Sequence, residues 1–460
     1  MKTSVIVIIA VIVIIVLGAG VYALTLAGST TTTPPTTSTT STPQTTSSTT
    51  SSSSSSSTAS SSSSSSTLPV TTSSSSTATS CTGTGSPINI GMMEDETGGV
   101  ATFANESIHM AQIAVDQINA AGGVNCHPLK LFTANEVPSA TAAANTLVLQ
   151  DNVSAMIGIT YAGDAESLFP FFAAHHVITI MTTASNNNLL QNLTTDYSAY
   201  QYFFRITPTD TIYAESVMNF TASILKPSSI YFVAEDLDFS HELFQNISSI
   251  AKSDGITIAG SSFVPLSQTA FDTTVTTVLA AKPGLVIDCQ TGSGAGAFIQ
   301  AFKASPQSAG VKFLYMCNGA LADPGFQGYL MSQDHTLLNG IVFQIEASTA
   351  TVPLNNVSSY LSTAYTKAMG PFYPYYSFVS NDYAAVHVLA AAMVKAGTVT
   401  NTTAIIKALE IVSYTGPTGT VQFDQQHLWS PDLWYTQIQN GTEKVIYPSV
   451  YANSSYNATA

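Results

Sequence analysis

The chain has 460 residues, and residues 87–460, which follow two unusual N-terminal segments, are long enough for two medium-sized domains with complete cores. The net charge is −15 with only 12 lysines and arginines, which excludes the basic surface of a nucleic-acid-binding protein. Only 8% of the residues are charged. Such a composition suits either a protein exposed to an acidic environment, since it loses little stability when carboxylates are protonated, or a heavily glycosylated surface.

The N-terminus contains an uncharged apolar run, residues 5–27, of about the length that spans a bilayer. Lys2 precedes this run and no basic residue follows it for a long way, so we expect residues 1–27 to anchor the chain in the cell membrane with the remainder outside. The run is longer than the apolar core of a usual signal peptide, which favours a retained anchor. Small residues near its end leave cleavage and secretion as the alternative.

Residues 28–86 consist almost entirely of Ser and Thr with a few prolines. Such a composition cannot bury enough apolar area to offset its conformational entropy, so it predicts a disordered and O-glycosylated linker. Asn-x-Ser/Thr sequons occur only after residue 87, which agrees with an exported glycoprotein.

Residues 88–133 predict a first βαβ unit. The apolar run 88–93 indicates a strand, the polar stretch 94–105 a loop, the amphipathic pattern 108–118 a helix, and residues 129–132 the next strand. A loop that follows a parallel strand lies at the carboxyl edge of the sheet, where open α/β sheets bind ligands. The loop at 94–105 is therefore the first candidate site loop.

The alternation of strands and helices continues along the rest of the chain and predicts an α/β fold with parallel sheets and helices on both faces. A break near residues 207–210 divides it into two runs, hence two lobes. The expected strands lie at 155–159, 177–181, 230–234, 256–263, 284–289, 312–316 and 341–345, and a last β-rich piece at 421–423 and 433–438.

Four cysteines suggest two possible disulfides. Cys81 precedes the first strand and Cys126 the second, and because neighbouring parallel strands bring these points together, a Cys81–Cys126 bridge is plausible. Cys289 and Cys317 each end a strand on the same side, where a second bridge and two buried thiols are equally compatible. The spacing of cysteines and histidines predicts no metal site.

Motifs of catalysis and of cofactor binding are absent from the sequence. There is no Gly-x-Ser-x-Gly elbow, His-Glu-x-x-His pair or P-loop, so we expect no enzyme activity. The stretch QTGSGAG at 290–296 has glycines spaced as Gly-x-Gly-x-Gly, which departs from the dinucleotide fingerprint, and no cofactor is expected.

The stretches IGMMEDETGGVA with AVDQINAAGGV, then MIGITYAGDAESLFPFFAAHHVITIMTTAS, then FRITPTD, resemble the type I periplasmic binding proteins of the branched-chain amino acid and amide class. These are substrate-binding subunits of ABC transporters. The resemblance covers residues 87–448 and implies two Rossmann-like lobes, joined by three crossovers, that close on a small ligand. The implied segments are 87–207 and 346–414 for lobe 1, 208–345 and 415–448 for lobe 2, and a tail at 449–460.

The resemblance also implies a ligand site at the strand ends. Phe103 takes the place of a loop aromatic that is often Tyr in relatives, and Phe239 that of a stacking Tyr in lobe 2. The turn at 161–163 replaces serines that hold a ligand carboxylate, and Thr183–Ser185 matches a backbone-and-hydroxyl clamp. The implied ligand-binding residues are Phe103, Tyr161, Ala162, Gly163, Asp164, Ala184, Ser185, Phe239, Thr291 (or Gly292) and Asn318.

Asn318 departs from the family pattern, because relatives place there the acidic residue that pairs with the ammonium of an amino acid. A buried ammonium without an anion costs several kcal/mol, so the resemblance implies an amide, a urea, a carboxylic acid or another neutral polar solute. Asp164 or Asp95 can supply a substitute anion, which keeps a cation possible, although Asp164 also suits a helix N-cap.

The function implied by the resemblance is that of an extracytoplasmic binding protein, which presents a small polar solute to the permease and ATPase subunits of an importer. Two alternatives keep the same fold: a sensor ectodomain, and a structural or adhesive cell-surface glycoprotein. The replacement of the acid at Asn318 gives the structural alternative its weight.

Overall fold

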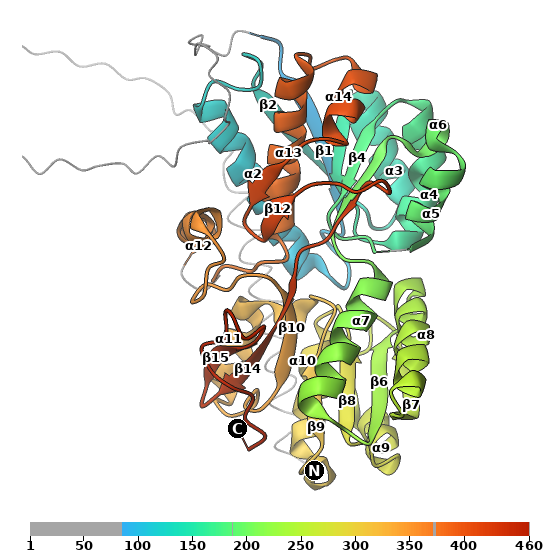
Figure 1. The fold of residues 1–460 in the computed structure, drawn as a ribbon, viewed down its shortest axis with the longest axis vertical. Coiled ribbons are helices and arrows are strands. Elements are labelled where there is room, and N and C mark those ends of the chain that lie inside the picture. The colour runs from blue at the N-terminus through green and yellow to red at the C-terminus, as the bar shows by residue number, and fades with distance from the viewer. Residues whose placement is uncertain (1–84, 186, 371–373, 460) are drawn as a thin grey trace, which may run out of the picture. The chain divides into compact units, whose positions relative to one another are not determined.

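The computed structural model describes residues 85–459 except 186 and 371–373, and these build two α/β lobes (Figure 1). The expected anchor at 1–27, nearly all of the expected linker, and Cys81 lie outside the described residues. Among the helices that are described, none combines the length and the apolar character needed to cross a bilayer.

The first lobe contains a six-stranded sheet in the order β13-β5-β4-β3-β1-β2, in which every pair is parallel. Its inner strands are buried on both faces: Met156 packs with one set of helices and its neighbour Ile157 with the other. This explains why the strands read as continuous apolar runs. The strands are β1 (Ile88–Glu94), β2 (Leu129–Asn135), β3 (Ala155–Gly158), β4 (Ile178–Met181), β5 (Phe203–Ile206) and β13 (Leu428–Trp429).

Helices cover both faces of this sheet, as Figure 1 shows. One face carries α2 (Ala101–Ala120), α12 (Asn356–Met369), α13 (Ser380–Ala396) and α14 (Thr402–Leu409), with the hairpin of β11 (Tyr414–Gly416) and β12 (Gly419–Val421). The other carries α3 (Ala140–Asn145), α4 (Ala162–Ala174), α5 (Asn187–Thr195) and α6 (Tyr197–Tyr200), and a π-helical turn, Thr146–Gln150, continues α3.

The second lobe contains a seven-stranded sheet in the order β15-β14-β10-β9-β8-β6-β7. Its strands are β6 (Ser229–Glu235), β7 (Thr257–Val264), β8 (Leu285–Cys289), β9 (Lys312–Tyr315), β10 (Val342–Glu346), β14 (Leu433–Gln439) and β15 (Thr442–Tyr447). The central strands of this sheet are parallel, as expected, and the last β-rich piece adds an antiparallel edge, because β14 runs antiparallel to both β10 and β15. The short turn at Asn440 and Gly441 allows only an antiparallel return.

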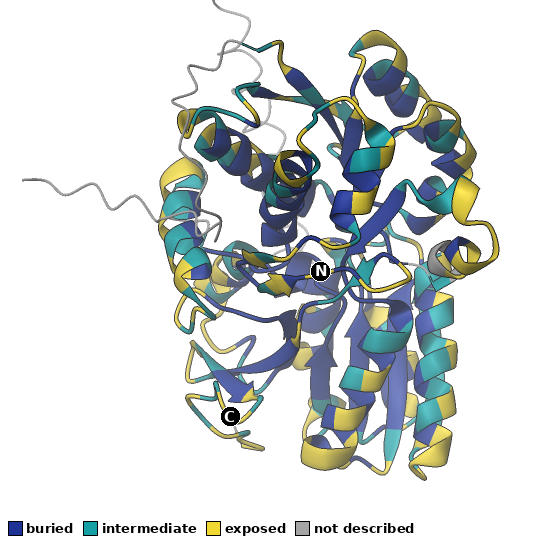
Figure 2. Ribbon diagram, turned by 45° about the horizontal axis from the view of Figure 1, so that its top comes forward, coloured by how far each residue is buried: buried dark blue, intermediate teal, exposed yellow. Residues whose placement is uncertain are grey.

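The helices of this lobe also lie on both sides of their sheet. They are α7 (Asp210–Phe220), α8 (Asp238–Ser253), α9 (Asp272–Ala280), α10 (Gly294–Ala304) and α11 (Pro324–Gln333). A π-helical turn, Thr221–Leu225, continues α7, and short 3₁₀ turns occur at Pro306–Ser308 and Ala320–Ala322. In both lobes the inner strands are buried, and the helices expose their outer sides (Figure 2).

The chain passes between the two sheets three times: between β5 and α7, between β10 and α12, and between β13 and β14. The third passage lies later than the boundary expected after residue 414, because Leu428 of β13 pairs with Arg205 of β5 in the first sheet. Several short β-like runs follow one another there, and their composition does not indicate which sheet each run joins.

The structure decides between a bridge and two thiols for Cys289 and Cys317. These two cysteines form a disulfide with a Cα–Cα distance of 5.3 Å, in the usual range. The bridge ties together the carboxyl ends of β8 and β9, which are parallel neighbours. The Cys81–Cys126 pairing stays a prediction, since Cys81 is outside the described residues.

Replacing both bridged cysteines, as in Cys289→Ser with Cys317→Ser, should lower the free energy of unfolding by about 3.5 kcal/mol, because the bridge closes a loop that is long enough to restrict the unfolded chain. Urea denaturation followed by circular dichroism measures the change. A chain that keeps its unfolding free energy after the double replacement would contradict a stabilising role for the bridge.

Candidate functional site

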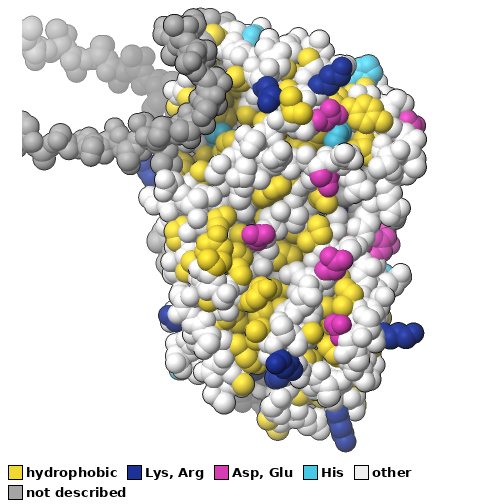
Figure 3. Space-filling view, viewed as in Figure 1, with side chains coloured by type: hydrophobic (Ala, Val, Ile, Leu, Met, Phe, Trp, Pro, Cys, Tyr) yellow, Lys and Arg dark blue, Asp and Glu magenta, His cyan; other side chains and the backbone are white. Residues whose placement is uncertain are grey.

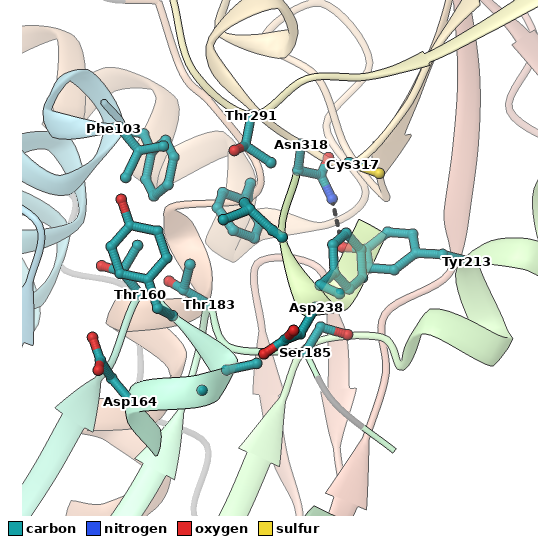
Figure 4. Close-up of a pocket in the computed structure, with 17 residues that line it drawn as sticks. Phe103, Thr160, Asp164, Thr183, Ser185, Tyr213, Asp238, Thr291, Cys317 and Asn318 are labelled. Carbon is teal, nitrogen blue, oxygen red and sulfur yellow. Dashed lines mark hydrogen bonds between the residues drawn. The ribbon is translucent and has the colours of Figure 1, made fainter. Parts of the chain in front are cut away.

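A cavity of about 280 Å³ lies between the two lobes, at the carboxyl ends of the strands of both sheets (Figure 4). The first lobe contributes the turns after β3 and β4 and the start of α2, and the second contributes the turns after β6, β8 and β9. The lining residues are Val100, Phe103, Thr160, Tyr161, Ala162, Gly163, Asp164, Thr183, Ser185, Tyr213, Leu237, Asp238, Phe239, Thr291, Cys317, Asn318 and Phe378.

The structure brings together most of the residues that the sequence placed in a site. Nine line this cavity: Phe103, Tyr161, Ala162, Gly163, Asp164, Ser185, Phe239, Thr291 and Asn318. Ala184 does not; its side chain is buried in the core of the first lobe, and its N–H donates to the carbonyl of Ile159. Asp164 is the third residue of α4, so it is not the N-cap, a position held by Tyr161.

Other lining residues were missed from the sequence. Tyr213 reaches the cavity from α7, the first helix after a crossing, where no strand end signals a site. Asp238 stands beside the expected Phe239 at the start of α8. Phe378 ends an aromatic stretch whose composition fitted a core as well as a cleft.

The two lobes touch at the rim of the cavity. A Cβ atom added to Gly99 would lie only 2.5 Å from Cγ of Leu266 in the second lobe. A Cβ atom at Gly292 would lie 3.1 Å from the carbonyl oxygen of Gly99. Glycine at these positions therefore permits the close approach of the two loops.

On the first-lobe wall, carboxyl groups of the protein bind the turn that follows β3. Glu136 accepts hydrogen bonds from the N–H groups of Thr160, at 2.8 Å, and Tyr161, at 3.2 Å. The Tyr161 hydroxyl donates to Asp95 at 2.6 Å, and the Thr160 hydroxyl to Glu94 at 2.7 Å. Asp95, which the sequence offered as a substitute anion, is thus buried behind Tyr161 and does not line the cavity.

The second-lobe wall repeats this arrangement. Glu235, at the end of β6, accepts from the N–H groups of Thr291, at 2.6 Å, and Gly292, at 2.9 Å. Burial raises the pKa of Glu235, and burial also raises the pKa of Glu136, to about 8. In both lobes the N–H groups of a strand-to-helix turn are occupied by a carboxyl group of the chain itself.

Asn318 is buried on the second-lobe wall with a left-handed backbone, φ 47°. Its side-chain amide donates to the Tyr213 hydroxyl at 2.9 Å, which Figure 4 draws as a dashed line. Tyr376, from the other lobe, donates to its carbonyl oxygen. Within the described part of the chain, the side-chain oxygen of Asn318 accepts no hydrogen bond.

The charged groups that line the cavity are the carboxylates of Asp164 and Asp238. Among the described lining residues there is no Lys, Arg or His. The described residues also contain no group of three or more His, Cys, Asp or Glu arranged to hold a metal ion. The face of the molecule in Figure 3 carries scattered charges among neutral polar side chains.

A pair of carboxyl groups joins the lobes away from the cavity. Glu106 of α2 is hydrogen-bonded to Asp323, which is the N-cap of α11, and Tyr365 donates to Glu106. Burial, together with the nearby negative charge of Asp323, raises the pKa of Glu106 to about 8, and burial raises the pKa of Asp323. One proton shared between the two carboxyl groups therefore holds this contact.

The free energy of unfolding should increase as the pH falls from about 8 towards the unfolded pKa of Glu, about 4.5. In this window the folded protein holds protons that the unfolded chain releases, and each such group contributes at most about 1.4 kcal/mol per pH unit. Chemical denaturation at a series of pH values measures the slope.

Glu106→Gln keeps a hydrogen-bond donor for Asp323 at every pH. It should therefore reduce the change of unfolding free energy per pH unit by the contribution of one titrating group. Glu215→Gln, at an exposed position of α7, is the matched control and should leave the slope unchanged. Equal slopes for Glu106→Gln and the unmodified chain would show that this pair holds no proton.

Comparisons with known proteins agree with this architecture. A model of the periplasmic binding protein family matches residues 87–443. A curated amino acid binding protein from Pseudomonas aeruginosa is 40% identical over 72 residues, which cover 15% of this chain and 19% of that protein. The match thus spans about a fifth of the length of that relative.

Solved structures share the fold over most of the chain. LivJ, a branched-chain amino acid transporter substrate binding protein from Streptococcus pneumoniae in complex with isoleucine, has a TM-score of 0.68 at 20% identity and covers 79% of this chain and 100% of its own. A solute binding protein of an ABC transporter from R. palustris in complex with 4-hydroxybenzoate has a TM-score of 0.69 at 13% identity, with coverages of 81% and 98%.

The family model covers well over half of the chain, and the fold neighbours cover the same two lobes. The resemblance identified from the sequence is confirmed, and the chain belongs to the periplasmic binding protein family.

Proposed function

We propose that the chain is the solute-binding subunit of an ABC importer and holds a small polar solute in the interlobe cavity. The observation that supports this most is the cavity itself, which is lined from both lobes at the carboxyl ends of their strands. LivJ with isoleucine and the R. palustris protein with 4-hydroxybenzoate share the fold. The proposal is one of binding without catalysis, in line with these transporter proteins.

The solute acts by holding the lobes together. A molecule in the cavity contacts residues of both lobes, such as Phe103 and Phe239, and so favours the closed arrangement over an open one. Closure gives the loaded protein a different shape from the empty one. The permease, which works with the ATPase subunits, then receives the solute from the closed form.

The N-terminal segments place this head near its transporter in the proposal. Residues 1–27 anchor the chain in the membrane, and residues 28–86 form a tether that keeps the head outside the cell. A tethered head stays close to a permease in the same membrane, which raises its effective concentration there.

A structural or adhesive cell-surface role is the second candidate. The observation that favours it is Asn318, which stands where relatives have the acid that pairs with an amino-acid ammonium. A protein that has lost its solute keeps the fold and shows no response to small molecules.

Binding of a solute to the folded state should raise the melting temperature. At a hundredfold excess over Kd, binding adds about 2.7 kcal/mol to the free energy of unfolding. We expect a shift from at least one member of a panel of amino acids, amides, amines, ureas and short carboxylic acids in differential scanning fluorimetry. No shift across the panel would favour the structural role.

Gly163→Phe tests whether the solute occupies this cavity. A Cβ atom at Gly163 meets nothing nearer than Asp238, at 3.7 Å, so the phenylalanine ring should enter the cavity and abolish the ligand-induced shift. Gly328→Phe, at a helical glycine with open space around it, is the matched control and should keep the shift. Loss of the shift in both variants, or in neither, would remove the cavity as the binding site.

A further inference from the structure

We propose that the solute carries a cationic group, such as an ammonium, and no carboxylate; this inference rests on the proposed function of the cavity. It narrows the solute to organic amines and related cations. Four features of the described residues point to it: two occupied anion sites, the carboxylate of Asp238 in the lining, one free acceptor and a set of aromatic rings.

The first feature is the occupied turn of the first lobe. N–H groups at the start of a helix form a ready site for a ligand anion. Here the N–H groups of Thr160 and Tyr161, just before α4, donate to Glu136, which is buried at 1% exposure. A ligand carboxylate that approached this turn would find these N–H groups engaged by Glu136 and the Tyr161 hydroxyl engaged by Asp95.

In the second lobe the corresponding N–H groups are also engaged by a carboxyl group of the chain. The N–H groups of Thr291 and Gly292, before α10, donate to Glu235, which is also buried. The Ser185 hydroxyl, which suited a carboxylate clamp, donates to the carbonyl of Pro208 at 2.8 Å. An anionic solute therefore finds these N–H groups and the Ser185 hydroxyl already engaged.

The second feature is the carboxylate of Asp238, which lines the cavity from α8. It lies opposite the first turn of α4, since a Cβ atom on Gly163 would lie 3.7 Å from a carboxylate oxygen of Asp238. The carboxyl group of Asp164, the other acidic lining residue, is hydrogen-bonded to Glu136. Asp238 attracts a cation in the cavity and repels an anion.

The third feature is the side-chain oxygen of Asn318. It belongs to a residue that is only 1% exposed, lies in the wall of the cavity, and accepts no hydrogen bond from the described residues. A buried acceptor left without a donor costs about 1–3 kcal/mol. An ammonium N–H supplies that donor, whereas a carboxylate would add a further acceptor.

Aromatic rings complete the site. Phe103 and Phe378 lie edge to face at 5.7 Å between ring centres, and Phe239 lies edge to face with Tyr213 at 6.1 Å. All four line the cavity. The faces of such rings attract cations, so the apolar surface of the cavity is compatible with a positively charged solute.

The test uses probes that share a body and differ in charge. Leucinamide is a cation, leucine a zwitterion, 4-methylvaleramide neutral and 4-methylvalerate an anion; benzylamine, benzamide and benzoate form a second set, and methylammonium and acetate a minimal pair. Isothermal titration calorimetry with the whole chain measures affinity. We expect the cation of a set to bind at least about tenfold more tightly than its anion.

Tighter binding of leucine, an amide or a carboxylate overturns the inference and leaves the proposed function standing. Equal response to all charges, including no response, also overturns the inference. The proposed function fails separately, when no solute of the broader panel stabilises the protein.

Variants test the named groups. Asn318→Asp should tighten binding of the best cationic probe by about tenfold, since aspartate also accepts the left-handed backbone of this position. Asp238→Asn should weaken it by about tenfold. Asp236→Asn is the matched control, because this exposed residue lies two positions earlier and outside the cavity lining. Weaker binding by Asn318→Asp, or equal effects of Asp238→Asn and Asp236→Asn, would overturn the assignment.

Discussion

Parallel strands of two separate sheets end at one common gap, and the rest of the molecule depends on this arrangement. Each turn at a strand end can then present a side chain to the gap, although these turns are far apart in the sequence. Three passages of the chain between the sheets keep these ends facing each other. A small cavity can thereby be lined by residues as distant in sequence as Phe103 of the first lobe and Asn318 of the second.

Buried carboxyl groups determine the electrostatics around this gap. Glu94, Asp95, Glu136 and Glu235 are all buried and are held by hydroxyl and N–H donors of the strand-end turns. A chain with only 12 lysines and arginines has few cations with which to neutralise such groups. Hydrogen bonds and bound protons take that role instead, as at Glu106 and Asp323. These buried carboxyl groups lie behind the cavity lining and engage donors of the turns that form its walls.

Much of this fold could be predicted from the sequence, because a strand that is covered on both faces has a continuous apolar sequence, such as residues 155–159. Site residues that directly follow those runs, among them Tyr161 and Asn318, could be named through the resemblance to the binding-protein family. Contacts that depend on distant pairing could not. Glu235 reaches a turn 56 residues later, and no local pattern marks that contact.

Two further misses have the same physical origin. Tyr213 lies on a helix face rather than at a strand end, so the signal used for the other residues does not apply to it. The choice of sheet by β13 depends on pairing with β5 across more than 200 residues of sequence. Ala184 shows the converse, since a residue beside the site in sequence can point into the core.

The Cys289–Cys317 bridge links the strand that leads to Thr291 with the residue just before Asn318, so one covalent bond connects two parts of the same cavity wall. Bonds of this kind persist in oxidising surroundings and are rare where thiols are kept reduced. Completion of this wall therefore depends on the redox conditions in which the chain folds.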